Sequence, residues 1–188
     1  MKSRVATRLA WSLCALSLAL TVLSILLLSL NYFHPRTHDY GYGPENILLP
    51  ICFSIIGAIL ASRLPTNPLG WLFCAAVSVS PVAHFSGEYA IYALLAQPQR
   101  LPAGEALAWL TAWVWISFIG FMVISLLLFP DGHLPGRRWA WLVWFTVLLT
   151  SVGSLWQAFS PGLIDSLGTI RNSLGAQARS CTLGYGLR

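Results

Sequence analysis

Five long uncharged stretches, separated by short polar segments, cover most of the chain; they are residues 9–35, 46–62, 64–87, 106–130 and 139–164. A helix needs about 20 mostly apolar residues to cross the hydrocarbon core of a membrane, with a lower limit near 17. All five stretches meet that limit, and the second only just does. Their apolar residues run on without alternating with polar ones, which favours helices over barrel strands. We therefore predict an all-α fold, a polytopic membrane helix bundle with five transmembrane helices.

Composition supports a membrane location. Hydrophobic residues make up 56% of the chain, charged residues only 9%, and the mean hydropathy is +0.69. Soluble domains carry about 25% charged residues. The net charge of +5 would otherwise suggest nucleic acid, but the basic residues lie in short segments between apolar runs, not on a soluble face. We expect lipid, and no nucleic acid, as a partner.

The apolar run near the N-terminus predicts a retained helix. A secretory signal has an apolar region of about 7–15 residues that ends at a cleavage site. Here the run follows "MKSRVATR" and continues past Leu30 into "NYFHP". We therefore interpret it as the first membrane helix.

Basic residues in the short loops predict the orientation. With the N-terminus in the cytoplasm, six of them lie inside and two outside; the inside set is Lys2, Arg4, Arg8, Arg63, Arg137 and Arg138, and the outside pair is Arg36 and Arg100. Short cytoplasmic loops are the ones enriched in lysine and arginine. Three arginines of the tail also lie outside and reduce the excess of basic residues on the inside. Residues far from a span, however, have less influence on orientation. An N-in, C-out topology follows.

The first inside loop, "SRLPTNPLGW", carries a helix start signal. Thr66 or Asn67 can cap the third helix, while Pro68 takes a first-turn position where its missing N–H costs nothing. Gly70 and Trp71 then enter the membrane interface.

The second inside loop, "FPDGHLPGRRW", is typical of a tight membrane turn with a basic anchor. Proline at the second position and glycine at the fourth predict a type I turn over residues 129–132, and residues 134–136 predict a type II turn. The turn residues singled out are Pro130, Asp131, Gly132 and Pro135. The arginine pair and the tryptophans at positions 139, 141 and 144 then suit the headgroup region.

A polar stripe on the third predicted helix is the main candidate site: Ser80, His84, Glu88 and Tyr92, spaced by four residues. Residues at this spacing share one helix face. Ionisable groups inside a span are costly and mark functional sites by default. Glu88 lies about 27 Å of helix beyond Gly70, close to the outer headgroups. Two interpretations stay open, an intramembrane site, or a snorkelling or interhelical hydrogen-bonding role. Pro81 is expected to kink this helix beside the stripe.

Other chemistry-bearing residues give weaker signals. His34, His38, Asp39 and Glu45 in the first outer loop lack a recognised metal-ligand spacing, so we predict a solvated loop and no metal. Cys14, Cys52 and Cys74 fall inside spans, and Cys181 is alone in the tail, which implies no disulfide framework. We find no nucleophile constellation, phosphate loop or dinucleotide fingerprint, and expect no cofactor. The internal repeats of a transporter are absent as well.

A resemblance adds a functional expectation. The segments "ASR", "NPLGWL", "EYAIYALLA", "LPAGEALAWLTAWVW" and "LLLFPDGHLPGRRW" resemble the N-terminal multi-helix membrane region of bacterial sensor histidine kinases common in actinobacteria and Chloroflexi-type bacteria. The similarity covers residues 47–165, and its most distinctive pieces are residues 67–71 and 129–135. His133 departs from the pattern, where arginine is common. The resemblance implies a multi-pass sensory module in the bacterial plasma membrane, with a homodimer or a kinase as partner.

The segment after the last apolar run departs from that family. We divide the chain into a membrane-embedded sensor-like domain, residues 1–165, and a polar tail, residues 166–188, expected to be disordered or truncated. Residues 172–175 are similar to an N-P-L-G stretch of the family, whereas nothing from residue 176 onward resembles it. No kinase core is present, so no enzyme activity is expected. Two hypotheses remain: a sensory input module without its kinase domain, or a free-standing small membrane protein that binds a partner protein or lipid.

Overall fold

The computed structural model describes residues 3–31, 45–97, 101–164, 167, 170–172 and 175. Five α-helices make up most of this part: α1 Ser3–Asn31, α2 Glu45–Arg63, α3 Pro68–Ile91, α4 Gly104–Leu128 and α5 Ala140–Phe159. A π-helical turn, η1 Tyr92–Ala96, continues α3, and a short 3-10 turn, η2 Arg137–Trp139, leads into α5. Strands are absent from the described residues, which hold only an isolated bridge between Leu163 and Arg171. The predicted all-α fold is confirmed.

Four helical segments are long and apolar enough to cross a membrane: Arg4–Asn31, Pro68–Ala96, Gly104–Leu128 and Arg137–Phe159. The apolar part of α2, Ile47–Arg63, is shorter. It lies near the lower limit of about 17 residues for a spanning helix. The bundle is thus that of a membrane protein, and the predicted fifth crossing depends on its shortest helix.

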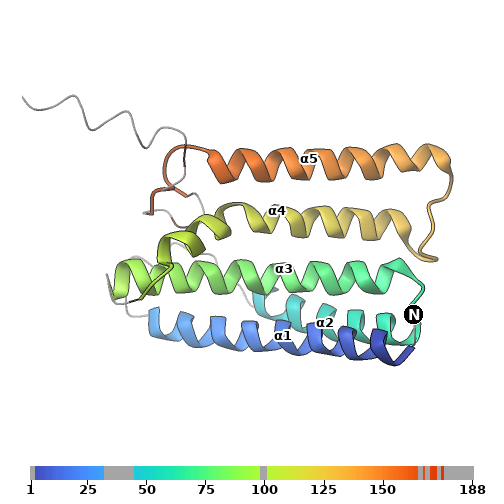
Figure 1. Cartoon of the computed structure of the whole chain (residues 1–188), viewed down its shortest axis with the longest axis horizontal. Helices are drawn as coiled ribbons and strands as arrows, with labels where there is room; N and C mark the ends of the chain where they lie inside the picture. Colours follow the sequence, from blue (N-terminus) through green and yellow to red (C-terminus); the bar gives the residue numbers. More distant parts are fainter. Residues whose placement is uncertain are drawn as a thin grey trace, which may run out of the picture.

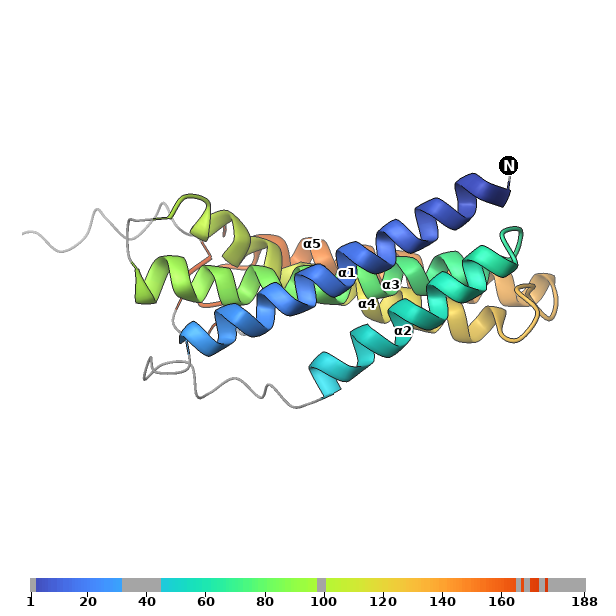
Figure 2. The same ribbon diagram turned by 90° about the horizontal axis from the view of Figure 1, so that it is seen from below.

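The helices lie side by side around α3 (Figure 1). α1 and α2 pack against each other and against α3, α4 packs against the other side of α3, and α5 packs against α4. Figure 2 shows α1 and α2 crossing α3 at a slant. The α2–α3 and α4–α5 connections lie at the same end of the bundle as the start of α1 (Figure 1). We call this the basic end, because exposed arginines gather there: Arg4, Arg8, Arg63, Arg137 and Arg138.

Small residues let α2 and α3 approach closely near the basic end. A Cβ atom on Gly70 would lie 2.5 Å from the Ala61 backbone nitrogen, and one on Gly57 would lie 3.1 Å from the Cys74 nitrogen. Ala10 of α1 packs into the same buried cluster. Close backbone approach through small residues is typical of helix pairs in membranes, where van der Waals packing drives association.

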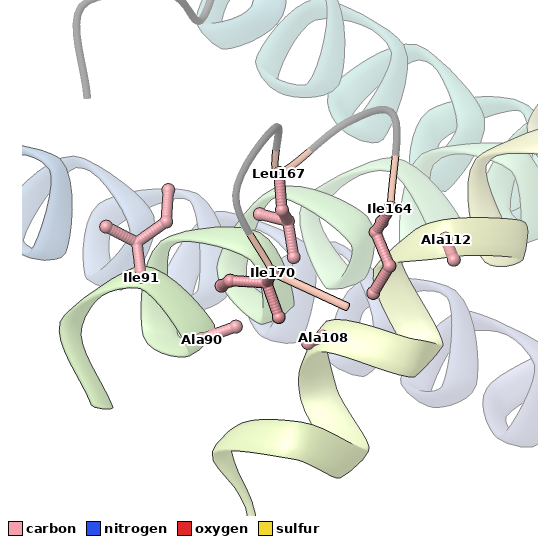
Figure 3. Packing of buried hydrophobic residues seen from close by; sticks show 7 residues of the cluster. All are labelled: Ala90, Ile91, Ala108, Ala112, Ile164, Leu167 and Ile170. Atoms are coloured by element: carbon pink, nitrogen blue, oxygen red, sulfur yellow. The ribbon is translucent and has the colours of Figure 1, made fainter. Parts of the chain in front are cut away.

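A second apolar cluster closes the far end, opposite the basic end. Figure 3 shows Ile164, Leu167 and Ile170, from the segment after α5, packed over Ala90 of α3 and Ala108 of α4. The Ile164 N–H donates to the Ile170 carbonyl at 2.9 Å. The described chain therefore packs against the bundle beyond residue 165, where the sequence places the domain boundary. Residues 176–188 lie outside the described part.

Candidate polar site in the helix bundle

Glu88 is a fully buried carboxyl group. It is 2% exposed on α3, and its partner is Asn31, the last residue of α1. The Asn31 Nδ2 atom donates to Glu88 Oε2 at 2.7 Å and to the Glu88 carbonyl at 3.0 Å. The carboxyl group thus does not snorkel to solvent but binds across to another helix.

The depth of this pair follows from the helix lengths. Glu88 comes 20 residues after Pro68, the first residue of α3. At 1.5 Å per residue this is about 30 Å, close to the thickness of the hydrocarbon core. Helix α1 also ends at Asn31. Both side chains therefore lie near the far end, where a buried amide can satisfy a carboxyl group that lipid cannot.

Ser80 and His84 border a different space from Glu88. Both are half-buried and line a cavity of about 200 Å³ that extends over α2, α3 and α4. His84 also borders a small pocket with Thr21 and Ser24 of α1. The stripe residues therefore lie in two different environments. Glu88 pairs with Asn31 of α1, whereas Ser80 and His84 line a cavity next to α2 and α4. Tyr92, half-buried, lies in the π-helical turn.

A buried relay of hydroxyl groups is the feature that sequence reasoning missed. The Ser17 Oγ atom of α1 donates to the Val77 carbonyl of α3 at 2.9 Å, and the Ser54 Oγ atom of α2 donates to Ser17 Oγ at 2.8 Å. Pro81 follows Val77 by four residues and has no N–H to give to that carbonyl. Ser17 supplies the missing donor, and α3 continues as a helix through Pro81. We call Ser54, Ser17 and the Val77 carbonyl the hydroxyl relay.

At the basic end the structure brings together the two loops that are predicted to lie inside the cell. Asn67 is the N-cap of α3, with its side chain accepting from the Leu69 N–H at 2.9 Å, and Pro68 takes the first helical turn. Of the two predicted caps, Asn67 is the one used. Gly132, at φ +76°, lies directly against the Asn67 side chain, and a Cβ atom there would collide with Asn67 Oδ1. The two sequence motifs therefore meet at one contact.

The turn types predicted for the second loop are wrong. The Gly132 N–H donates to the Leu128 carbonyl at 2.8 Å, so the first turn closes over five residues instead of four, and the Phe129–Pro130 peptide bond is cis. Gly136 has φ 176° and ψ 164°, which is extended backbone rather than the positive φ of a type II turn. Gly132 instead takes a positive φ of +76° against the Asn67 side chain, a contact that local turn preferences do not include.

The remaining residues of the second loop form the surface of the basic end. Pro130, Asp131 and Pro135 are exposed. The Nδ1 atom of His133 lies 2.9 Å from the Asp131 carbonyl. The arginine pair that follows is exposed, as are the three tryptophans at positions 139, 141 and 144. Such exposure suits anchors in the headgroup region.

Metal-binding geometry is absent from the described residues, in which no three His, Cys, Asp or Glu side chains gather. His34, His38 and Asp39 lie outside those residues, as do the side chain of Glu45 and the whole of Cys181. The three described cysteines, Cys14, Cys52 and Cys74, are free.

Comparison with known proteins gives no match: no family model, no curated protein and no solved structure is similar to this chain. The resemblance to sensor histidine kinases therefore stays a prediction that depends on the two loop motifs.

Proposed function

We propose that the chain is a sensory input module in a bacterial plasma membrane, with the basic end in the cytoplasm and a histidine kinase as its output partner. The observation that carries the proposal is Glu88, buried in a span and held by Asn31. An ionisable group in this position is expensive, and function is the usual reason for its presence. The chain itself carries no phosphoacceptor or nucleotide-binding motif.

Three contacts give this module a physical route between its ends. The Asn31–Glu88 pair joins α1 to α3 at the far end, and the hydroxyl relay joins α1, α2 and α3 farther along. The Asn67–Gly132 contact joins the two cytoplasmic loops. Hydrogen bonds between packed helices are either made or broken, so a change in charge at Glu88 biases discrete arrangements of α1 relative to α3.

A chimera tests the proposal. Residues 1–165 replace the corresponding region of an intact related sensor histidine kinase, whose next membrane helix returns the chain to its cytoplasmic core, and the autophosphorylation rate is measured in native membranes. Glu88→Gln keeps the side-chain shape and removes the charge. We expect the basal rate to change by about fivefold, the lower end of typical coupling between sites. Asn31→Ala, which removes the partner, should change the rate in the same direction.

Glu105→Gln is the matched control, since Glu105 is exposed in the first turn of α4. It makes the same chemical change outside the buried site and should leave the rate unchanged. Membrane insertion of every variant is checked by quantitative immunoblotting. If Glu88→Gln and Asn31→Ala chimeras insert normally and signal like the parent, Glu88 has only a packing role and the sensory proposal loses its support.

The second hypothesis, a free-standing protein that binds a partner or lipid, is favoured by the position of α5. Among the described helices, this one packs mainly against α4 and η2, and Trp144 and Trp156 are 73% and 74% exposed on it. Such a surface suits acyl chains or another membrane helix. The chimera separates the hypotheses, because a protein that only binds a partner or lipid has no reason to couple Glu88 to a fused kinase.

A further inference from the structure

The bundle contains a cavity that neither Asn31 nor Glu88 lines. It measures about 200 Å³ and lies over α3, between α2 and α4; its lining residues are Leu49, Pro50, Phe53, Ser80, Ala83, His84, Trp115 and Phe118. α2 and α4 both pack on α3, and the cavity lies between the two where they flank it. Ala83 is buried at its base, whereas Leu49 and Trp115 are exposed at the bundle surface. The cavity therefore opens sideways, toward the lipid.

We propose that this cavity binds a lipid-soluble aromatic molecule of one ring that carries one hydroxyl or similar hydrogen-bonding group. The size fits, since an apolar protein cavity of about 150 Å³ holds benzene. The lining fits as well, because Phe53, Trp115 and Phe118 offer ring faces and edges for stacking.

The polar group of the ligand has defined partners. Ser80 and His84 are one helical turn apart on α3, and both line the cavity. They provide a hydroxyl group and an imidazole ring on an otherwise apolar wall. A hydrogen bond made in this setting avoids exposing a polar group to hydrocarbon, so it favours an aromatic alcohol or phenol over a plain acyl chain.

This site deepens the proposed sensory function, because it lies one helical turn from Glu88 and gives the module a chemical class of stimulus. Its test is nevertheless independent of signalling. The full chain in lipid nanodiscs is photolabelled with trifluoromethyl-diazirinyl benzyl alcohol, a one-ring probe with a hydroxyl group, and the labelled peptides are identified by mass spectrometry. We expect label on cavity residues such as Phe53 and Trp115, and loss of that label with excess unlabelled benzyl alcohol.

Variants of Ser80 give the quantitative test. Ser80→Ala removes one hydrogen-bonding group and should weaken competition by benzyl alcohol about fivefold. Ser80→Leu also fills the space and should abolish cavity labelling. Ser78→Leu is the matched control: Ser78 lies two residues away and its hydroxyl bonds within α3, to the Cys74 carbonyl at 2.7 Å. It should leave the labelling unchanged.

A second probe distinguishes the proposed ligand from a lipid tail. The analogue that has a methyl group in place of the hydroxymethyl group should label the cavity about fivefold less at equal membrane concentration. Equal labelling by both probes, together with no effect of Ser80→Ala, would show an apolar space filled by acyl chains and overturn the proposal. Label spread evenly over lipid-facing residues would overturn it too. Failure of the kinase chimera alone would leave this site intact.

Discussion

The hydroxyl relay predicts a specific energetic coupling between Ser17 and Pro81. Ser17→Ala removes two buried hydrogen bonds, one to the Val77 carbonyl at 2.9 Å and one from Ser54 at 2.8 Å. Interhelical hydrogen bonds in membranes contribute about 0.6 kcal/mol on average and about 1.7 kcal/mol at most. The Val77 carbonyl would be left with no donor, so we expect a loss of about 2 kcal/mol in the free energy of unfolding.

Ser17→Ala should lower the free energy of unfolding by less once Pro81 is replaced. Pro81→Ala restores a backbone N–H four residues after Val77, and that N–H can satisfy the carbonyl within α3. In this background Ser17→Ala loses only the bond from Ser54, about 0.6 kcal/mol. The double-mutant cycle should therefore show a coupling energy of about 1.4 kcal/mol, and any packing defect caused by removing the proline ring cancels in the cycle.

Unfolding in mixed micelles titrated with dodecyl sulfate, followed by far-ultraviolet circular dichroism, measures these free energies. Ser12→Ala is the matched control on α1, because Ser12 is exposed and bonds within its own helix, to the Leu9 carbonyl at 2.9 Å. Its effect should stay within about 0.5 kcal/mol. A coupling energy near zero would refute the idea that Ser17 replaces the donor missing at Pro81.

Three further predictions follow from other parts of the chain. Reporter fusions at positions 65 and 134 should show a cytoplasmic location and a fusion at the C-terminus an external one; an internal C-terminus would contradict five crossings, with α2 as the helix that does not cross. The purified chain should neither autophosphorylate nor hydrolyse ATP, and labelled phosphate above a blank would contradict this. Gly70→Ala should destabilise the bundle by about 1–3 kcal/mol, as expected for overpacking, because its Cβ atom would lie 2.5 Å from a backbone nitrogen of α2. Gly136→Ala is the control, with nothing within 4 Å of the added atom, and equal unfolding free energies for the two variants would refute the close approach.

Sequence reasoning located the helices well, because length and continuous apolarity are properties of a single segment. It also found the Asn67 cap, since an N-cap is satisfied by residues next to it in the chain. Sequence reasoning could not predict the hydrogen-bond partners of the buried polar groups. Asn31 and Glu88 are 57 residues apart, and Ser17 and Val77 are 60 apart. Which residues meet at such separations depends on how the helices cross, and several serines of α1 were equally plausible donors.

The second loop and the segment after α5 show the limits of local patterns. Turn preferences at Pro130 and Gly136 depend on neighbouring residues alone, and they do not include the contact between Gly132 and Asn67. The boundary at residue 165 was placed where the long apolar run ends. Single apolar residues beyond it, Leu167 and Ile170, carry no periodic signal, yet both are buried.

Burial at the far end also limits how quickly Glu88 can exchange with water. The residue is 2% exposed, and the Asn31 amide covers its carboxyl group from α1. A water-soluble carbodiimide should thus modify exposed Glu105 at the rate of the reagent itself, but reach Glu88 only as often as this cover opens. The rates of proton exchange and chemical modification at Glu88 would then measure how often the bundle opens around this residue. The measurement leaves the hydrocarbon-facing surface of the bundle unchanged.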